Sequence, residues 1–178
     1  KKIGARYIYV GKNFRFGKDG EGDSKTLYSL SHAYNFRLKA FDMVKISGKP
    51  ISSTFIRGLI TEGKINIARK LLARPVSILG TVIKGTSLAT KLGFPTANIN
   101  PHHEVLPPSG IYAALIIYNN RKFKGACYIG RRPTFAKEEQ KHIEVHIFNF
   151  KKNIYGEDLE IQFIEKIRDD KRFNSTES

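Results

Sequence analysis

The chain has 178 residues, 40% of them hydrophobic, which suits one or two small domains with a buried core. It carries 31 Lys and Arg residues against 16 Asp and Glu, a formal net charge of +15 that attracts polyanions such as nucleic acid, anionic membranes or nucleotide phosphates. A basic surface without a particular partner is the alternative, and the scattered basic residues favour it and small nucleotides over DNA or RNA. The single cysteine excludes an internal disulfide and fits a cytoplasmic protein, and no apolar run approaches the roughly 18 residues of a membrane-spanning helix.

The first part of the chain alternates strand-like and helix-like segments. Residues 6–11 predict a short buried strand, and the apolar spacing in residues 25–36 predicts a helix. Residues 39–47 alternate like a strand, and two helices follow at residues 51–63 and 65–73. This order predicts an α/β layer with a parallel sheet.

After Pro75 the chain becomes almost entirely strand-like, with turn signals between the strands. The predicted strands cover residues 76–85, 111–118, 122–130, 142–150 and 159–167. Asn119-Asn120 joins the second and third at hairpin distance, and NIYGED joins the last two. Five or more short strands in about a hundred residues predict a small closed β-barrel. We therefore expect two domains, residues 1–74 and 75–178, with GFPTAN (93–98) in a loop between the first two barrel strands.

The start of the helix at residues 51–63 is a candidate anion site. Ser52 and Ser53 would lie at the helix N-terminus, where free backbone N–H groups attract phosphate, and Arg57 follows one turn later. Ordinary capping by these hydroxyl groups explains the same spacing and is the commoner arrangement. The Gly-rich residues 17–22 are not followed by the Lys-Ser/Thr pair of a P-loop, which excludes that motif.

The stretch GFPTAN offers hard oxygen ligands in a stiff loop. Gly93 permits close backbone approach, Pro95 restricts the loop, and the Thr96 hydroxyl and Asn98 carbonyl oxygen suit Mg²⁺ when phosphates complete its coordination. Gly85, upstream, would let a neighbouring loop fold over a nucleotide. A simple turn, with its polar groups bonded to local backbone, is the alternative.

Strand alternation in KHIEVHIFNF places one carboxylate between two imidazoles. His142, Glu144 and His146 share a face with Phe148 and Phe150. This pattern fits a two-histidine, one-carboxylate metal site, a general base, or a half-exposed strand face. Same-face neighbours on one strand lie roughly 6.5–7 Å apart, which disfavours three ligands to one metal, so we prefer Glu144 as a base.

Several motifs together resemble one family. They are GTVIKGTSLATKLGFPTANI, LPPSGIYAALI, YIGRRPTF, EVHIFNF, IYGEDLEIQF and IRDDKRF in the second part, and YVGKNFRFGKDGEGD and ISSTFIRGLI in the first. The chain is similar to bacterial bifunctional riboflavin kinase/FMN adenylyltransferases, also called FAD synthetases. The resemblance covers nearly all of the chain and implies part of a Rossmann-like nucleotidyltransferase layer followed by a Greek-key β-barrel kinase domain.

The resemblance also implies ligands and residue roles. The kinase would phosphorylate riboflavin to FMN with ATP and Mg²⁺, and the parent protein would adenylylate FMN to FAD. Thr96 would ligate Mg²⁺, Asn98 would support the metal site, and Glu144 would be the catalytic base. The residues implied around the ATP phosphates are Gly85, Lys91, Gly93, Pro95, Thr96 and Asn98 in the barrel, and Ser52, Ser53 and Arg57 in the adenylyltransferase half; Asn13, Phe14 and Gly17 would lie near the nucleotide.

This sequence departs from the family at several points. Ala89-Thr90 replaces the usual Gly-Arg, for which Lys91 or Lys84 could substitute, and Tyr128 stands where many members have Asn. The His-containing adenylyltransferase motif and the helix after RDDKRF have no counterpart, so we expect a piece of a longer protein that makes no FAD itself. We expect no nucleic-acid or membrane partner. A basic barrel that binds nucleic acid and a metal-dependent hydrolase using His142, Glu144 and His146 are the alternatives.

Overall fold

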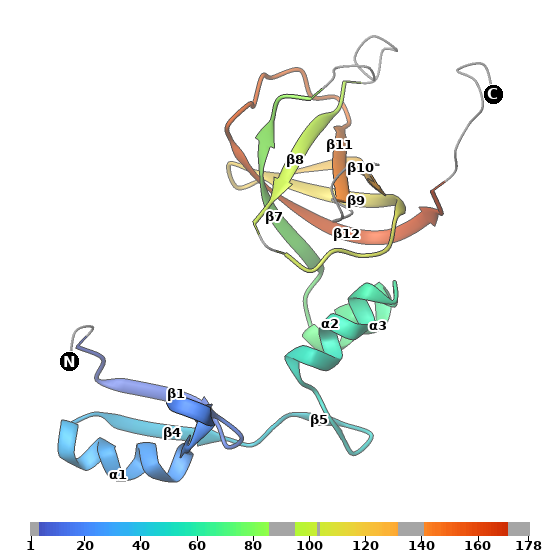
Figure 1. Ribbon diagram of the computed structural model, residues 1–178. Helices are drawn as coiled ribbons and strands as arrows, with labels where there is room; N and C mark the ends of the chain where they lie inside the picture. Colours follow the sequence, from blue (N-terminus) through green and yellow to red (C-terminus); the bar gives the residue numbers. More distant parts are fainter. Residues whose placement is uncertain (1–3, 86–94, 103, 132–140, 171–178) are drawn as a thin grey trace. The chain divides into compact units, whose positions relative to one another are not determined.

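The computed structural model describes residues 4–85, 95–102, 104–131 and 141–170 (Figure 1). Lys91 and Gly93, two of the predicted phosphate-binding residues, lie outside these ranges. The chain forms two compact units, Lys1–Ser53 and Thr54–Ser178.

The first unit is built on a βαβ arrangement. Strands β1 (Tyr7–Gly11) and β4 (Arg37–Phe41) pair in parallel, and helix α1 (Ser24–Tyr34) connects them. The Asp23 carboxylate accepts a hydrogen bond from the backbone N–H of Thr26 at 2.8 Å, which caps the start of α1. The predicted α/β layer with parallel strands is confirmed. The short elements of this unit are β2 (Arg15–Phe16), η1 (Lys18–Gly20), β3 (Gly22–Asp23), β5 (Lys45–Ile46) and β6 (Lys49–Pro50).

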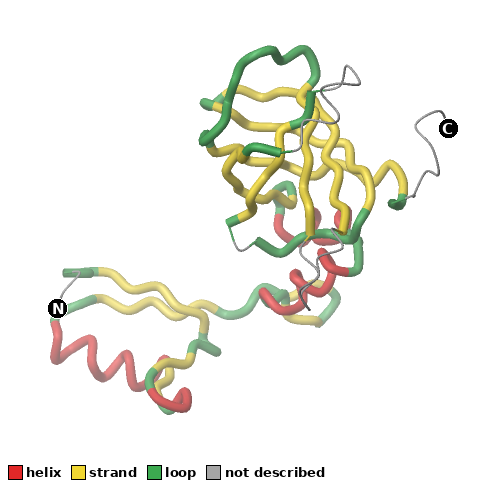
Figure 2. The backbone as a smooth tube through the Cα atoms, turned by 45° about the horizontal axis from the view of Figure 1, so that its top comes forward, coloured by secondary structure: helices red, strands yellow, loops and turns green. Residues whose placement is uncertain are grey.

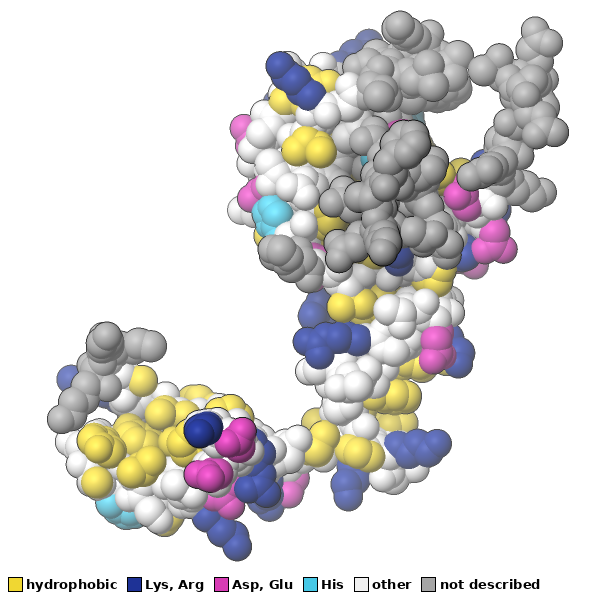
Figure 3. Space-filling view, in the orientation of Figure 1, with side chains coloured by type: hydrophobic (Ala, Val, Ile, Leu, Met, Phe, Trp, Pro, Cys, Tyr) yellow, Lys and Arg dark blue, Asp and Glu magenta, His cyan; other side chains and the backbone are white. Residues whose placement is uncertain are grey.

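Strand β1 is less buried than its sequence indicates. Tyr7 is 57% exposed and Tyr9 is 64% exposed, and Phe41 on β4 is also exposed. The prediction of a buried strand is therefore wrong, because this two-stranded sheet leaves Tyr7 and Tyr9 exposed and only half-buries Ile8 and Val10. Figure 3 shows hydrophobic side chains gathered on the visible face of this unit.

Helices α2 (Ser53–Thr61) and α3 (Ile65–Leu72) confirm the two helices predicted before Pro75. The chain reverses between them at Gly63, whose φ of +77° is readily adopted only by glycine. Ile56, Leu59 and Ile60 of α2 are buried, and α3 packs against strands β7 and β12. Both helices therefore belong mostly to the second unit, so the compact units divide about twenty residues before the predicted domain boundary at 74/75.

The second unit contains a closed barrel of six antiparallel strands (Figure 2). Its strands are β7 (Val76–Ile83), β8 (Ala97–Pro101), β9 (Gly110–Tyr118), β10 (Arg121–Arg131), β11 (Lys141–Ile147) and β12 (Asp158–Arg168). Around the barrel the order is β10-β11-β8-β7-β12-β9. Strand β12 lies beside β9, followed by β10 and β11, which is the Greek-key order. The predicted Greek-key barrel is confirmed.

Two features of the barrel differ from the prediction. Ala97 and Asn98 begin strand β8 rather than lying in a loop, because Ile99 points into the core and the strand pairs with both β7 and β11. Strand β11 ends at Ile147 instead of residue 150, before Asn149 adopts a left-handed conformation with a φ of +56°. The segment NIYGED does connect β11 with β12, but these strands pair with other neighbours.

Alternate side chains of every long strand fill the barrel. The largest fully buried ones are Ile78, Tyr112, Ile116, Ile129, Ile143, Val145, Leu159, Ile161 and Phe163. The rings of Tyr112 and Phe163 meet edge to face with centroids 5.3 Å apart, a favourable arrangement for two aromatic quadrupoles. These two strands, β9 and β12, thus contribute the aromatic centre of the core.

We expect Phe163→Ala to lower the free energy of unfolding by about 3–5 kcal/mol, because it leaves a cavity in a close-packed core. Urea unfolding followed by circular dichroism measures this change. Phe148→Ala is the control. Because Phe148 is 46% exposed, this substitution should lower the free energy of unfolding much less. Equal losses of stability in the two variants would contradict the packing described here.

Candidate functional site

A carboxylate on the outer face of β11 is held by two side chains. The Thr96 hydroxyl donates a hydrogen bond to Glu144 Oε2 at 3.2 Å, and His142 Nε2 lies 2.6 Å from Glu144 Oε1. Thr96 immediately precedes β8, which pairs with β11 so that Asn98 lies opposite Glu144. Because Ile143 and Val145 point into the core, the Glu144 side chain between them faces outward. The structure thus brings together Thr96 and Glu144, which are 48 residues apart in the sequence.

The turn before β8 is fixed on both sides. The carbonyl oxygen of Pro95 lies 2.8 Å from His146 Nδ1, so the ring N–H donates to it. Asn98 is only 8% exposed, and a methyl group added at Gly85 would overlap its side-chain amide. Because Gly85 has no side chain, the backbone after β7 can lie directly against the side-chain amide of Asn98.

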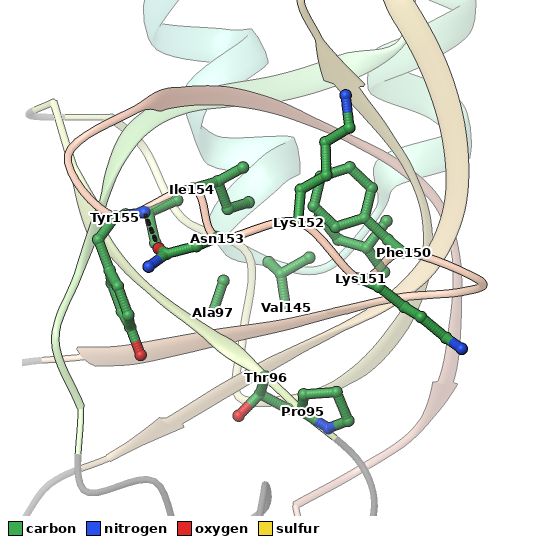
Figure 4. Close-up of a pocket in the computed structure, with 12 residues that line it drawn as sticks. Pro95, Thr96, Ala97, Val145, Phe150, Lys151, Lys152, Asn153, Ile154 and Tyr155 are labelled. Atoms are coloured by element: carbon green, nitrogen blue, oxygen red, sulfur yellow. Dashed lines mark hydrogen bonds between the residues drawn. The ribbon is translucent and has the colours of Figure 1, made fainter.

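A cavity of about 280 Å³ opens beside this turn (Figure 4). One wall is formed by Pro95, Thr96 and Ala97, and the others by the inward-facing ends of β7 and β11 and the β11–β12 connection. Figure 4 shows Asn153 bonded to the backbone of Tyr155, where the side-chain oxygen accepts the N–H at 3.1 Å. The remaining lining residues are Val82, Val145, Ile147, Phe150, Lys151, Lys152 and Ile154. The cavity therefore combines apolar and aromatic walls with two cationic side chains.

Sequence reasoning missed the residues of the β11–β12 connection. It extended β11 to residue 150, which assigned Phe150 to a strand face and left Lys151 and Lys152 without a role. The cluster of basic, aromatic and turn-forming residues in NFKKNIYGED was the available signal. It also did not anticipate that Tyr128, directly across from Glu144 on β10, donates a hydrogen bond to Asp170 Oδ1 at 3.1 Å. Burial and this contact raise the pKa of Tyr128.

The second predicted site lies on other elements. Ser53 is the first residue of α2 and is exposed, and Ser52 precedes it and is half-buried. Arg57 is exposed on the same helix and does not line the cavity beside Thr96. In the first unit, Phe14 stacks on Phe16 with ring centroids 5.8 Å apart. Asn13 and Phe14 lie between β1 and β2, and Gly17 lies between β2 and η1.

The imidazoles on the face of Glu144 do not converge on one point. His142 contacts the carboxylate, whereas His146 contacts the Pro95 carbonyl oxygen. Within the described ranges, no group of three His, Cys, Asp or Glu side chains is placed to hold a metal ion. The two imidazoles of this face therefore contact different groups, a side-chain carboxylate and a backbone carbonyl.

Cys127 is a core residue, as its apolar neighbours predict. It is fully buried on β10, and burial raises its pKa to about 12. Because only the thiolate reacts, its thiolate fraction near pH 8 should be far below that of an ordinary cysteine. We expect negligible labelling by iodoacetamide in the folded protein and rapid labelling in urea, measured by mass spectrometry. Labelling at equal rates would contradict this burial.

A family model matches the part of the chain that contains the barrel. The family model described as riboflavin kinase matches residues 72–178, which contain all six barrel strands, Thr96 and Glu144. The chain belongs to the riboflavin kinase family. A second family model, FAD synthetase, matches residues 1–55.

Curated relatives of this riboflavin kinase family member include bifunctional riboflavin kinase/FMN adenylyltransferases. The protein of Buchnera aphidicola is 40% identical over 98% of this chain and 57% of its own length. That of Pseudomonas fluorescens is 34% identical over 99% and 57%, and that of Escherichia coli K12 is 33% identical over 98% and 56%. The chain thus spans about half the length of the curated relatives it matches.

A solved structure also matches this member of the riboflavin kinase family. It is named macrolide-efflux protein from Streptococcus pneumoniae. The match has a TM-score of 0.74 and 29% identity, and covers 98% of this chain and 56% of the other. Within the described ranges of our chain, no helix is long and apolar enough to cross a membrane.

Proposed function

We propose that residues 75–178 form a riboflavin kinase that transfers the γ-phosphoryl group of ATP to riboflavin and yields FMN. The observation that carries this proposal is the Glu144 carboxylate, bonded to the Thr96 hydroxyl beside a cavity with basic and aromatic walls. The family and the names of the curated relatives support the same activity.

Glu144 would act as the general base. As the terminal ribityl hydroxyl of riboflavin attacks the γ-phosphorus, its proton passes to the carboxylate, a new P–O bond forms, and ADP leaves with the electrons of the broken P–O bond. Each Glu144 oxygen has lone pairs beyond the one that its present partner uses, so the carboxylate can accept a substrate hydroxyl. Positioning of the two substrates supplies much of the remaining rate enhancement.

The donor set before and within β8 fits Mg²⁺. Thr96 offers a hydroxyl oxygen and Asn98 an amide oxygen, which are the hard ligands that Mg²⁺ takes when phosphates and water complete its coordination. When bound, Mg²⁺ neutralises charge on the ATP phosphates. In this proposal Thr96 and Asn98 hold the metal, and Gly85 and Pro95 shape the backbone around the phosphates. Lys91 and Gly93 keep their predicted roles there.

The cavity beside Thr96 would hold the nucleoside part of ATP. Its volume of about 280 Å³ is close to the lower end of the ligand-pocket range of about 300–1,000 Å³. Tyr155 and Phe150 supply aromatic surface, and Lys151 and Lys152 supply positive charge where the pocket meets solvent. In this proposal the phosphates lie toward Thr96 and the adenine ring lies toward the β11–β12 connection.

For residues 1–74 we propose a place in an FMN adenylyltransferase domain of the parent protein. The parallel β1–β4 pair and the FAD synthetase match over residues 1–55 support this assignment. Ser52 and Ser53 at the start of α2, with Arg57, would bind ATP phosphates for the synthesis of FAD from FMN. Asn13, Phe14 and Gly17 would lie near the nucleotide. We also propose a cytoplasmic location, because the one cysteine is a free thiol.

The test is to incubate the protein with riboflavin, ATP and Mg²⁺ and to separate the flavins by chromatography. FMN that forms only when both ATP and Mg²⁺ are present supports the proposal. Absence of FMN at saturating substrates, with the protein shown to be folded, contradicts it. Salt-sensitive retention on single-stranded DNA without FMN formation would instead favour the nucleic-acid-binding alternative.

A further inference from the structure

His142 makes the shortest contact with the proposed base. It lies on β11, two residues before Glu144, and its Nε2 is 2.6 Å from Glu144 Oε1. Both side chains are largely covered, with 18% and 27% of their surface exposed. A hydrogen bond in a half-buried place competes less with water than one on an open surface. The contact therefore constrains the Glu144 side chain.

Two donors at two oxygens fix the plane of a carboxylate. The terminal torsion of a glutamate is broad, so a single hydrogen bond leaves the carboxylate free to rotate about it. Here Thr96 donates to Oε2 and His142 lies on Oε1. Because a carboxylate only accepts hydrogen bonds, the His142 Nε2 atom carries the proton in this contact.

We propose that His142 is a positioning residue that holds the Glu144 carboxylate in the orientation needed to accept the proton of the riboflavin hydroxyl. This inference rests on the proposed kinase function. It assigns different tasks to the two imidazoles on this face, since His146 donates to the Pro95 carbonyl oxygen and so fixes the turn that carries Thr96. His142 acts on the base itself.

The kinetic test compares His142→Ala with His142→Gln. We expect His142→Ala to lower kcat by about 10- to 100-fold, because misplacing a catalytic group by about 1 Å can lower the rate by up to about 100-fold. The KM for riboflavin and for ATP should change little, since His142 acts on the base. His142→Gln can donate from its amide to Glu144 and should recover most of kcat. His102→Ala is the matched control, because His102 is bonded to Thr81 on another part of the barrel.

The outcomes separate the two proposals. A wild-type rate in His142→Ala, or an equal loss of kcat in His142→Gln and His142→Ala with both proteins folded, would overturn the positioning role and leave the kinase proposal intact. A wild-type protein that makes no FMN would overturn the kinase proposal itself. In that case ¹⁵N-resolved imidazole spectra still test the contact: a His142 Nε2–H signal that shifts in Glu144→Gln supports it, and an unshifted signal refutes it.

Discussion

Replacing Glu144 with Gln is expected to lower kcat for FMN formation by about 10²–10⁴-fold, the usual contribution of a general base. The amide has nearly the shape of the carboxylate and can still accept the hydrogen bond from Thr96, but it cannot take up the proton of the attacking hydroxyl. Substrate binding should therefore survive. Steady-state rates with riboflavin and ATP, together with flavin-fluorescence titrations, measure both quantities.

Glu165→Gln provides the control for this experiment. Glu165 is an exposed carboxylate on β12, so its replacement makes the same change of charge without touching the site. We expect it to keep the wild-type rate. A Glu144→Gln protein as active as Glu165→Gln would show that Glu144 is not the base.

Thr96→Val is expected to raise the Mg²⁺ concentration needed for half of the maximal rate by about 10–100-fold or more, and to lower kcat as well. The substitution preserves volume but removes the hydroxyl, which is the proposed metal ligand and also the donor to Glu144 Oε2. Loss of the metal ligand changes the dependence of the rate on Mg²⁺ concentration, whereas loss of the hydrogen bond to Glu144 lowers kcat at saturating Mg²⁺. Rates measured over a range of Mg²⁺ concentration separate the metal effect from the effect on the base.

Thr81→Val is the matched control for the loss of a threonine hydroxyl. Thr81 lies on the neighbouring strand β7, and its hydroxyl donates to Asp158 at 2.6 Å and lies 2.8 Å from His102. We expect this variant to follow the Mg²⁺ dependence of the wild type. If Thr96→Val did the same, the proposed ligand role of Thr96 would be wrong.

Local sequence pattern predicted the individual elements better than their pairing. The switch from α/β alternation to strands near Pro75 is encoded in apolar spacing, and both helices before it were recognised. Strand β8 was missed because Gly93 and Pro95 dominate the stretch in front of it, whereas its stability comes from pairing with β7 and β11. The Greek-key order is set by contacts distant in sequence, which periodicity does not report.

In the candidate site, too, the individual residues could be predicted better than their contacts. Thr96 and Glu144 could be selected from residue type, strand alternation and family resemblance, but their contact depends on the register of β8 against β11. Strand alternation indicates His142 as a possible metal ligand, and only its side-chain position shows that it contacts Glu144. The cavity formed with the β11–β12 connection was missed because β11 ends earlier than alternation indicates.

The central claim is that phosphoryl transfer takes place at Thr96 and Glu144 on the barrel. A crystal structure of the protein with riboflavin, ADP and Mg²⁺ tests this most directly. We predict Mg²⁺ coordinated by the Thr96 hydroxyl, the nucleotide in the cavity lined by Lys151 and Tyr155, and the ribityl hydroxyl of riboflavin hydrogen-bonded to Glu144. Nucleotide and flavin bound away from Thr96 and Glu144 would contradict the account.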